Sequence, residues 1–426
     1  MTASMATAPS ATGVTARQEW ARHWPAMAAC MSGMLLGSIA TYAFGLFIQP
    51  LQDEFGWSRA EMSSALTVVS VISFFAFPFV GRLVDRFGVR AIALPGVLLN
   101  GVMFAAIGMI NNGSIAIWWL SWAMFALAFA MVNPTVWAKA VSRRFTAGQG
   151  FALAILMCGS TLATLIIPSL SGWAIDRFGW RWAFAVVGMV PSLAAFSLGL
   201  LALRERDIGT AALAAGAPQS GMSDQPGYTF AEAIRSPAVI KLLLSLLLTM
   251  GITVGSLVHM VPILSERGLD RASAAVAISV FGLGSTGTKL LCGWLTDRGV
   301  DTRWLGVVTF GAIAPGCALL LIPAPGFVVA ALALLFISTA AGGMMQLSAV
   351  LTIRYSGLRS FGQVYGLVAG LLAISGGFGP LVAGLIFDVT GSYTGLMLVG
   401  LPVAAVTMLM MATLGPRPVF PAGRSA

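Results

Sequence analysis

Long runs of apolar residues, separated by short polar or charged stretches, make up most of this 426-residue chain. A helix needs about 20 mostly apolar residues to cross the hydrocarbon core of a bilayer. By that length, the chain contains about twelve candidate membrane-spanning helices. They cover approximately residues 24–51, 61–80, 91–110, 115–138, 150–170, 181–203, 238–264, 272–295, 304–322, 326–352, 361–387 and 394–414. The pattern predicts an all-α membrane protein of twelve transmembrane helices.

A polar stretch divides these spans into two sets of six. The segment from Arg204 to Ser236 consists largely of Ala, Gly, Ser and charged residues, which are too polar to insert into lipid. We therefore expect five parts: an N-terminal tail of residues 1–23, a six-helix half of residues 24–203, a connecting loop of residues 204–237, a second six-helix half of residues 238–414 and a C-terminal tail of residues 415–426.

The two halves repeat one another with a constant offset of 212 residues, as from Gly81 to Gly293. The same offset relates further pairs, which are Pro50 and Pro262, Glu54 and Glu266, Gly56 and Gly268, Arg59 and Arg271, Asp85 and Asp297, Arg86 and Arg298, Gly150 and Gly362, Pro168 and Pro380, Gly172 and Gly384, Asp176 and Asp388, and Gly179 and Gly391. Chance matches do not keep one register over so many spans. The repeat predicts two pseudo-symmetric halves in parallel orientation, an arrangement that places a binding site between them.

The charged residues support a membrane protein and indicate its orientation. Only 9% of the residues are charged, against about 25% in soluble proteins. The net charge of +9 forms no basic tract, so we expect no nucleic-acid partner. With both termini in the cytoplasm, 18 of the 24 Lys and Arg residues fall on the inner side and five on the outer. This asymmetry predicts a multi-pass protein of the cell (cytoplasmic) membrane.

The sequence GRLVDRFGVR closes the second span and opens the third, and GWLTDRG repeats it one half later. Its glycine permits close helix approach, and Asp85 can sit near the start of the next helix and pair with Arg86 or Arg90. Because a plain turn does not explain the recurrence, we expect a conformational latch on the cytoplasmic side. Its residues are Gly81, Asp85, Arg86, Arg90, Gly293, Asp297 and Arg298.

The pattern G-x-x-x-D-R-x-G-x-R between the second and third of twelve spans resembles the signature of the major facilitator superfamily. Two stretches, YAFGLFIQPLQDEFGWSR and FGPLVAGLIFDVTGSY, resemble its branch of monocarboxylate transporters and oxalate:formate antiporters. The first resemblance covers nearly the whole chain. It implies alternating access by rocking of the two halves, and the second implies transport of small organic anions.

The eighth span carries Lys289 within GLGSTGTKLLCGW. The glycines of this stretch mimic a nucleotide-binding loop, but no strand precedes them, so helix packing explains them better. By helical rise, Lys289 lies about 12 Å from Asp297 and about 27 Å from Arg271, inside the hydrocarbon. All 15 acidic residues map to loops or span ends. A buried cation without a counter-ion predicts an anionic substrate, although the lysine could instead snorkel, bind helix-end carbonyls or stay neutral.

The resemblance sharpens this expectation and also shows departures from it. Members of the branch have an arginine on the eighth span, and Lys289 occupies the corresponding position here. A lysine presents a single point charge, whereas an arginine can bind a carboxylate through two parallel hydrogen bonds. Animal monocarboxylate carriers have a lysine on the first span, where this chain has Leu46, and an acid where it has Ser285. A coupled proton must then be carried by His259 or by the substrate itself, or the protein exchanges anions without a proton.

Other residues within the spans are candidates for lining the binding site. His259 precedes a proline on the seventh span, and it could bind the anion, carry a coupling proton or simply bond a backbone carbonyl. By helical rise it lies about 17 Å from the depth of Lys289. The complete predicted substrate-binding set is Lys289, His259, Tyr42, Asn133, Gln346, Ser375, Thr161 and Met157.

These observations predict a secondary active transporter for a small organic anion, which we expect to be a monocarboxylate. No nucleophile–base arrangement appears, so we expect no enzymatic activity. Four cysteines at unrelated spacings argue against disulfides and zinc, and we expect neither a cofactor nor a metal. We expect a monomer with protons as a possible second substrate. The alternatives are an efflux transporter for drugs or hydrophobic compounds, and a membrane sensor that binds a ligand without moving it.

Overall fold

The computed structural model describes residues 16–145, 149–203, 227–357, 359–416 and 418. Helices dominate these residues. The first seven are α1 (Ala16–Leu36), α2 (Ile39–Phe55), α3 (Arg59–Phe87), α4 (Val89–Ile110), α5 (Ile115–Met131), α6 (Pro134–Ser142) and α7 (Gln149–Ala202). Most of the expected tails and connecting loop lies outside the described residues.

Nine more helices are described, and the first of them still lies within the expected connecting loop of residues 204–237. They are α8 (Phe230–Ala233), α9 (Pro237–Val258), α10 (Met260–Glu266), α11 (Arg271–Asp297), α12 (Thr302–Gly311), α13 (Ile313–Leu320), α14 (Gly326–Ser356), α15 (Phe361–Thr390) and α16 (Thr394–Ala412). Short breaks, rather than full loops, divide α9 from α10 and α12 from α13.

The described residues form 11 apolar stretches that are long enough to cross a membrane. One of them, Phe151–Ala202, has 52 residues, more than twice the length that a single crossing needs. Within it, Gly179 adopts φ 77° and ψ 164°, which only glycine tolerates readily, so the chain reverses there. The segment therefore crosses twice, and the expected fold of twelve transmembrane helices is confirmed.

Helix starts follow from local sequence. Ser58 accepts a hydrogen bond from the Glu61 N–H while the Glu61 carboxylate accepts from the Ser58 N–H, which forms a capping box at the start of α3. Asp270 caps α11 by accepting from the Ser273 N–H at 3.1 Å. These caps fix where the long helices α3 and α11 begin.

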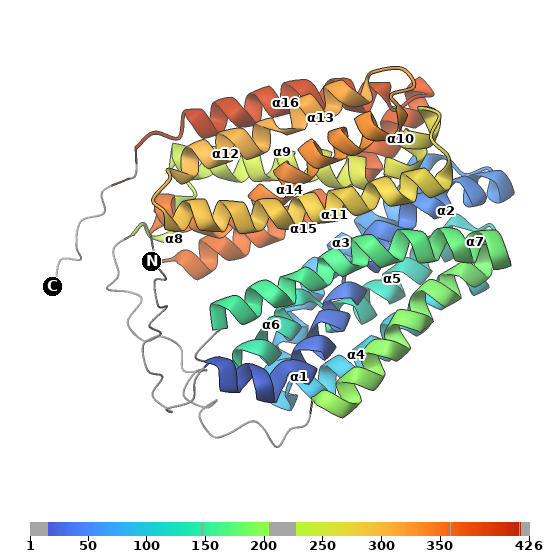
Figure 1. Ribbon diagram of the computed structural model, residues 1–426, viewed down its shortest axis with the longest axis horizontal. Helices are drawn as coiled ribbons and strands as arrows, with labels where there is room; N and C mark the ends of the chain where they lie inside the picture. Colours follow the sequence, from blue (N-terminus) through green and yellow to red (C-terminus); the bar gives the residue numbers. More distant parts are fainter. Residues whose placement is uncertain (1–15, 146–148, 204–226, 358, 417, 419–426) are drawn as a thin grey trace, which may run out of the picture.

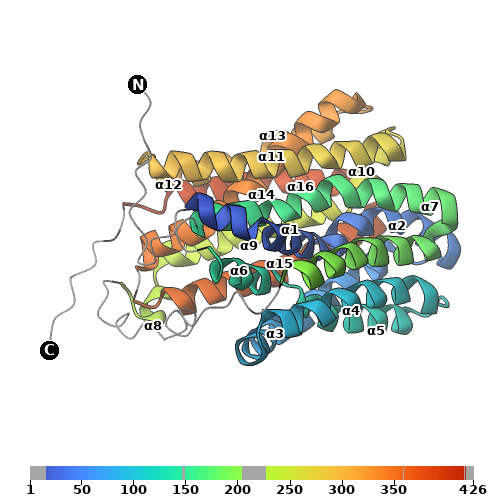
Figure 2. The ribbon, with the colours of Figure 1, turned by 60° about the horizontal axis from the view of Figure 1, so that its bottom comes forward.

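Helices α1–α7 pack with one another, and α9–α16 do the same (Figure 1). We refer to these groups as the N-terminal and C-terminal halves. The halves meet mainly along two helix pairs, α3 with α15 and α7 with α11. Figure 2 shows α7 and α11 side by side from a second direction. We call the end of the bundle where α1 begins and α16 ends the proximal end, and the end where α2 gives way to α3 the distal end.

Candidate functional site

One face of α11 lies against α7 of the other half. Gly282 and Thr286 are four residues apart, so they lie on the same side of the helix. A Cβ built on Gly282 would come within 2.6 Å of the Thr164 Cβ, so only glycine fits there. One turn further on, the hydroxyl groups of Thr286 and Thr161 are hydrogen-bonded. The predicted site residue Thr161 thus joins the two halves.

Lys289 continues this face toward the proximal end. It lies three residues beyond Thr286, about 4.5 Å along the helix axis. Its side chain is half-buried and lies near the thiol of Cys158 on α7. Within the described part of the chain, Lys289 forms no ion pair and no hydrogen bond. The inter-half interface thus carries a cation that the described protein groups leave unpaired.

Three described carboxylates bind partners that lie away from Lys289. Glu54 pairs with Arg181 at 2.5 Å, and Asp301 pairs with Arg354 at 2.6 Å. Asp388 accepts from two backbone N–H groups at the start of α3. None of these carboxylates lies along α11, where Lys289 is placed.

Gln346, Tyr42 and Met157 have side chains that are at least partly accessible. Gln346 comes from α14, and its Nε2 would lie 3.5 Å from a Cβ on Gly293, one helical turn beyond Lys289. The Tyr42 hydroxyl makes no hydrogen bond to any described residue. The Met157 side chain is 37% exposed and directly precedes Cys158. All three side chains thus keep some accessible surface, unlike Asn133 and Ser375.

Asn133 and Ser375 use their polar groups within the protein. Asn133 caps α6, because its Oδ1 accepts from the Thr135 N–H at 2.8 Å while its Nδ2 donates to the Ala130 carbonyl at 2.8 Å. The Ser375 hydroxyl donates to the carbonyl of Leu247 on α9 at 2.6 Å. Both side chains are buried and tie the local structure together, as polar groups within membranes commonly do.

His259 lies at the break between α9 and α10 and is fully buried. Its Nδ1 is 2.6 Å from the hydroxyl of Tyr393, which directly precedes α16. Its Nε2 is 3.0 Å from the hydroxyl of Ser63 on α3 and 3.0 Å from the carbonyl of Pro380 on α15. Both ring nitrogens therefore have protein partners, and the bond to Ser63 crosses between the halves.

Asp388 makes a second connection between the halves at the distal end. Its carboxylate accepts from the N–H groups of Arg59 at 2.9 Å and Ala60 at 2.8 Å, where the first amides of α3 have no helical partner. We call Arg59, Ser63, His259, Asp388 and Tyr393 the distal closure. Arg59 and Asp388 both belong to pairs related by the 212-residue repeat, but the sequence did not indicate that these two residues contact one another.

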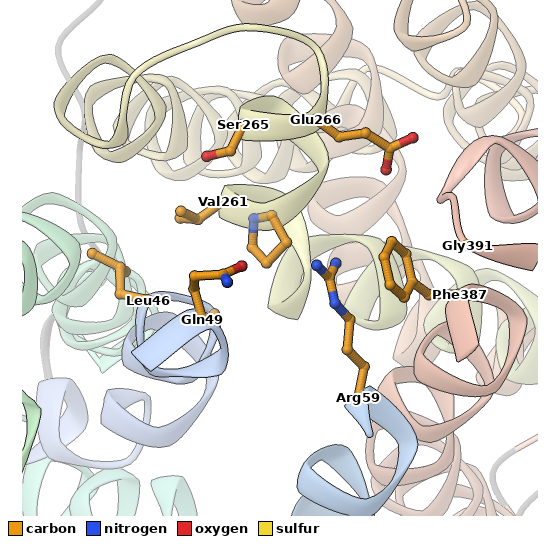
Figure 3. Close-up of a pocket in the computed structure, with 10 residues that line it drawn as sticks. Leu46, Gln49, Arg59, Val261, Ser265, Glu266, Phe387 and Gly391 are labelled. Carbon is orange, nitrogen blue, oxygen red and sulfur yellow. The ribbon is translucent and has the colours of Figure 1, made fainter. Parts of the chain in front are cut away.

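A pocket of about 330 Å³ lies beside the distal closure (Figure 3). The Arg59 side chain points into it, and its guanidinium carbon lies 3.5 Å from the centre of the Phe387 ring. The other lining residues are Gly45, Leu46, Gln49, Val261, Pro262, Ser265, Glu266 and Gly391. Leu46, where the resemblance led us to look for a lysine, thus faces a pocket separate from Lys289.

At the proximal end, no hydrogen bond or ion pair between described residues joins the two predicted latch motifs. Arg90 donates to the Leu203 carbonyl at 2.9 Å, and Arg298 stacks on Trp294 at 3.6 Å. Among the described residues, no atom from another helix lies within 4 Å of a Cβ built on Gly81, so the close helix approach expected there is absent in this conformation. The Asp85 side chain lies outside the described part of the structure.

Comparison with known proteins identifies the class of protein. The sequence profile of the Major Facilitator Superfamily matches residues 30–377 and 271–426. Monocarboxylate transporter 11 of Homo sapiens is 26% identical over 383 residues, which cover 87% of this chain and 77% of that protein. Monocarboxylate transporter 13 of Bos taurus is 26% identical over 83% of this chain and 80% of its own length. The uncharacterized MFS-type transporter YcxA of Bacillus subtilis is 23% identical over 82% of this chain and 85% of its own length.

Solved structures share the fold at low sequence identity. The nucleoside transporter NupG, solved as a point mutant, superposes with a TM-score of 0.73 at 12% identity, over 92% of this chain and all of the other. A bacterial homolog of the human lysosomal transporter Spinster superposes with a TM-score of 0.65 at 18% identity, over 92% of this chain and 95% of the other. Together, the twelve spans and the profile match show that this chain is a multi-pass membrane transporter, not an enzyme, and that it belongs to the major facilitator superfamily.

Proposed function

We propose that this transporter carries a small monocarboxylate and that the Lys289 ammonium binds the carboxylate group between the two halves. The observation that carries the proposal is the position of Lys289. It lies on the face of α11 that meets α7, half-buried and without an ion pair to any described acid. A charge at this depth is costly unless a partner neutralises it, and an anionic substrate supplies that partner.

The other predicted site residues that remain accessible suit a small substrate. Gln346 and Tyr42 offer an amide and a hydroxyl to carboxylate or hydroxyl oxygens, while Met157 and Cys158 offer an apolar wall. The relatives named monocarboxylate transporters support the same substrate class. The proposed site therefore combines one charge with a few polar groups and a short apolar surface, as small-molecule sites commonly do.

The halves work by alternating access in this proposal. The distal closure holds the distal end together, and opening that end requires the bond between Ser63 and His259 and those of Asp388 to α3 to break. The motifs around Gly81 and Gly293 would then come together and latch the proximal end. The free space at Gly81 supports this assignment, because a helix can approach there without a clash.

The proximal end faces the cytoplasm in this proposal, and both termini lie there. The excess of Lys and Arg in the loops at that end supports this orientation in the cell membrane. Coupling occurs either to a proton or to a counter-moving anion. The absence of an acid at Ser285 means that a coupled proton must use His259 or the substrate itself.

Counterflow of a labelled monocarboxylate into proteoliposomes tests the proposal. Lactate loaded inside should drive uptake of labelled lactate by the wild-type protein, and Lys289→Gln should reduce it at least tenfold. Lys241→Gln is the matched control, because Lys241 also lies in a spanning helix but donates to the Thr413 carbonyl at 2.9 Å, away from the interface. Unchanged counterflow by folded Lys289→Gln would reject the site.

The same assay separates the alternative functions. An efflux transporter for hydrophobic compounds would move neutral or cationic compounds and would be indifferent to Lys289→Gln. A sensor would bind the carboxylate without any counterflow. An imposed pH gradient distinguishes the two coupling modes, because only proton coupling lets the gradient drive accumulation without an internal anion.

A further inference from the structure

The pocket beside the distal closure has the features of a binding site separate from Lys289. Its volume of about 330 Å³ falls within the range of roughly 300–1,000 Å³ that is common for small-molecule sites. Its polar lining includes the side chains of Arg59, Gln49 and Ser265. Leu46, Val261, Pro262 and Phe387 contribute apolar surface. A ligand with one polar end and a short apolar body fits this lining.

Arg59 sets the charge of that ligand. Its side chain is only 9% exposed, yet it points into the pocket (Figure 3). The guanidinium stacks on Phe387 and lies 5.0 Å from the centre of the Tyr393 ring, while its Nε donates to the Gln52 amide oxygen at 3.4 Å. No described carboxylate forms an ion pair with it. Stacking holds the guanidinium plane in place and leaves an edge for a carboxylate.

The acids nearest to this arginine are already hydrogen-bonded elsewhere. Glu266 lines the pocket, but its two oxygens accept from the Ser392 hydroxyl and from the Tyr393 N–H at 3.1 Å. Asp388 accepts through both oxygens from the backbone at the start of α3. These neutral donors leave both carboxylates charged, but neither carboxylate forms an ion pair with the guanidinium, so the free edge of Arg59 can still bind a carboxylate. With Glu266 at its edge and one cation among its lining residues, the pocket suits a monoanion better than a dianion.

The pocket exists only when the distal end is closed. Leu46, Gln49 and Arg59 belong to the N-terminal half, whereas Val261 and Phe387 belong to the C-terminal half. Separation of the halves at this end would pull these walls apart. A ligand that binds one conformation better than another shifts the equilibrium toward it. An occupant of this pocket therefore holds the transporter in the distal-closed state.

From these contacts we propose that the Arg59 pocket is a second binding site for a small monocarboxylate, one that stabilises the distal-closed conformation from the distal side. The carboxylate lies against the edge of the guanidinium, and the apolar body lies among Leu46, Val261 and Pro262. The site is independent of the transport role proposed for Lys289, because it lies at the distal end of the bundle and shares no residue with that site.

Benzoate binding to the purified full-length protein in the Lys289→Gln background tests this proposal. Sodium benzoate should raise the unfolding temperature in a saturable way, and sodium chloride at equal ionic strength should not. Adding Arg59→Gln should remove the saturable rise, and Arg59→Lys should weaken benzoate at least fivefold. Arg177→Gln is the matched control, because Arg177 is an exposed arginine that does not line the pocket.

Two further measurements keep the proposal falsifiable if Arg59→Gln fails to fold. Ser265→Phe leaves Arg59 in place but fills the pocket, so it should also remove the benzoate effect. Hydrogen exchange of the amides of Arg59 and Ala60, which Asp388 holds, should slow several-fold on adding benzoate. The proposal would be overturned if the Arg59 and Ser265 variants kept their benzoate affinity or if benzoate had no saturable effect on Lys289→Gln. Unchanged hydrogen exchange at Arg59 and Ala60 on adding benzoate would overturn it as well. Loss of transport in Lys289→Gln bears only on the other site.

Discussion

The hydroxyl groups of Thr161 and Thr286 meet where α7 of one half crosses α11 of the other, one helical turn from Lys289. This contact places Lys289 at the interface of the halves rather than on a lipid-facing surface. In a protein that works by relative movement of its halves, the two helices must change their contact during the cycle. The pair therefore offers a direct way to test both the interface and the movement.

Cross-linking should arrest transport. With the native cysteines replaced by alanine, Thr161→Cys and Thr286→Cys together should form a disulfide on mild oxidation, because residues whose side chains touch have suitable Cα separations. Counterflow should stop on oxidation and return on reduction. Each single-cysteine variant serves as the control and should be insensitive to oxidant. Full counterflow by the oxidised, cross-linked protein would show that α7 and α11 do not separate during transport.

Loss of the Asp388 charge should loosen the distal closure. In Asp388→Asn, one of the two backbone bonds at the start of α3 is lost along with the charge that favours a helix N-terminus, at a cost of about 0.5–2 kcal/mol. Hydrogen exchange at Arg59 and Ala60 should accelerate correspondingly, by roughly 2- to 30-fold. Asp53→Asn is the control, because the exposed Asp53 carboxylate accepts from Gln49 on the same helix. Equal exchange rates in Asp388→Asn and wild type would contradict the role of this contact.

Substitution of His259 should affect stability and conformation more than carboxylate affinity. His259→Leu leaves the Tyr393 hydroxyl, the Ser63 hydroxyl and the Pro380 carbonyl without their buried partner, and each unsatisfied group costs about 1–3 kcal/mol. The unfolding temperature should fall clearly, and Ser63→Ala should lower it less. Carboxylate affinity in the Lys289 site should change less than threefold. A large affinity loss without a loss of stability would instead indicate direct substrate contact by His259.

Acid should remove a stabilising pair at the proximal end. Burial alone would raise the pKa of Asp301, but the Arg303 N–H and the Arg354 guanidinium hold it below its ordinary value. A carboxyl group with a lowered pKa stabilises the fold above its unfolded pKa of about 4, and this contribution disappears as the pH falls through the lower folded value. Because both side chains are partly exposed, the gain stays below about 1 kcal/mol. The unfolding temperature of Asp301→Asn should lie below that of wild type at pH 7, and the difference should shrink progressively as the pH falls below the unfolded pKa of about 4.

The sequence predicted the fold well because lipid imposes a simple rule on helix length and composition. The repeat from Gly81 to Gly293 could be found by spacing, and Lys289 could be found by its charge within an apolar span. The sequence could not show that Asp388 meets the start of α3 or that Ser63 meets His259, because these contacts depend on how the two halves are docked. The pairing of Arg59 with Phe387 is likewise a tertiary contact between segments more than 300 residues apart.

Some predicted site residues have structural partners that spacing could not reveal. Asn133 and Ser375 are polar groups inside spans, as Gln346 is, and the sequence gives no sign that the first two bond to nearby backbone carbonyls. Lys289 differs from them because its long side chain has no acid at its own depth. Charge therefore indicated a candidate binding residue more clearly than polarity did.

Equilibrium binding of a carboxylic acid and its isosteric amide tests the central claim most directly. Propionate and propionamide have nearly the same shape, but only propionate can neutralise the Lys289 ammonium. Both proteins to be compared carry Arg59→Gln, which excludes binding in the distal pocket. The protein that retains Lys289 should bind propionate at least tenfold more tightly than propionamide. In Lys289→Gln this preference should disappear. Equal binding of the two compounds by the protein that retains Lys289, or an undiminished preference in Lys289→Gln, would contradict the assignment of Lys289 as the carboxylate site.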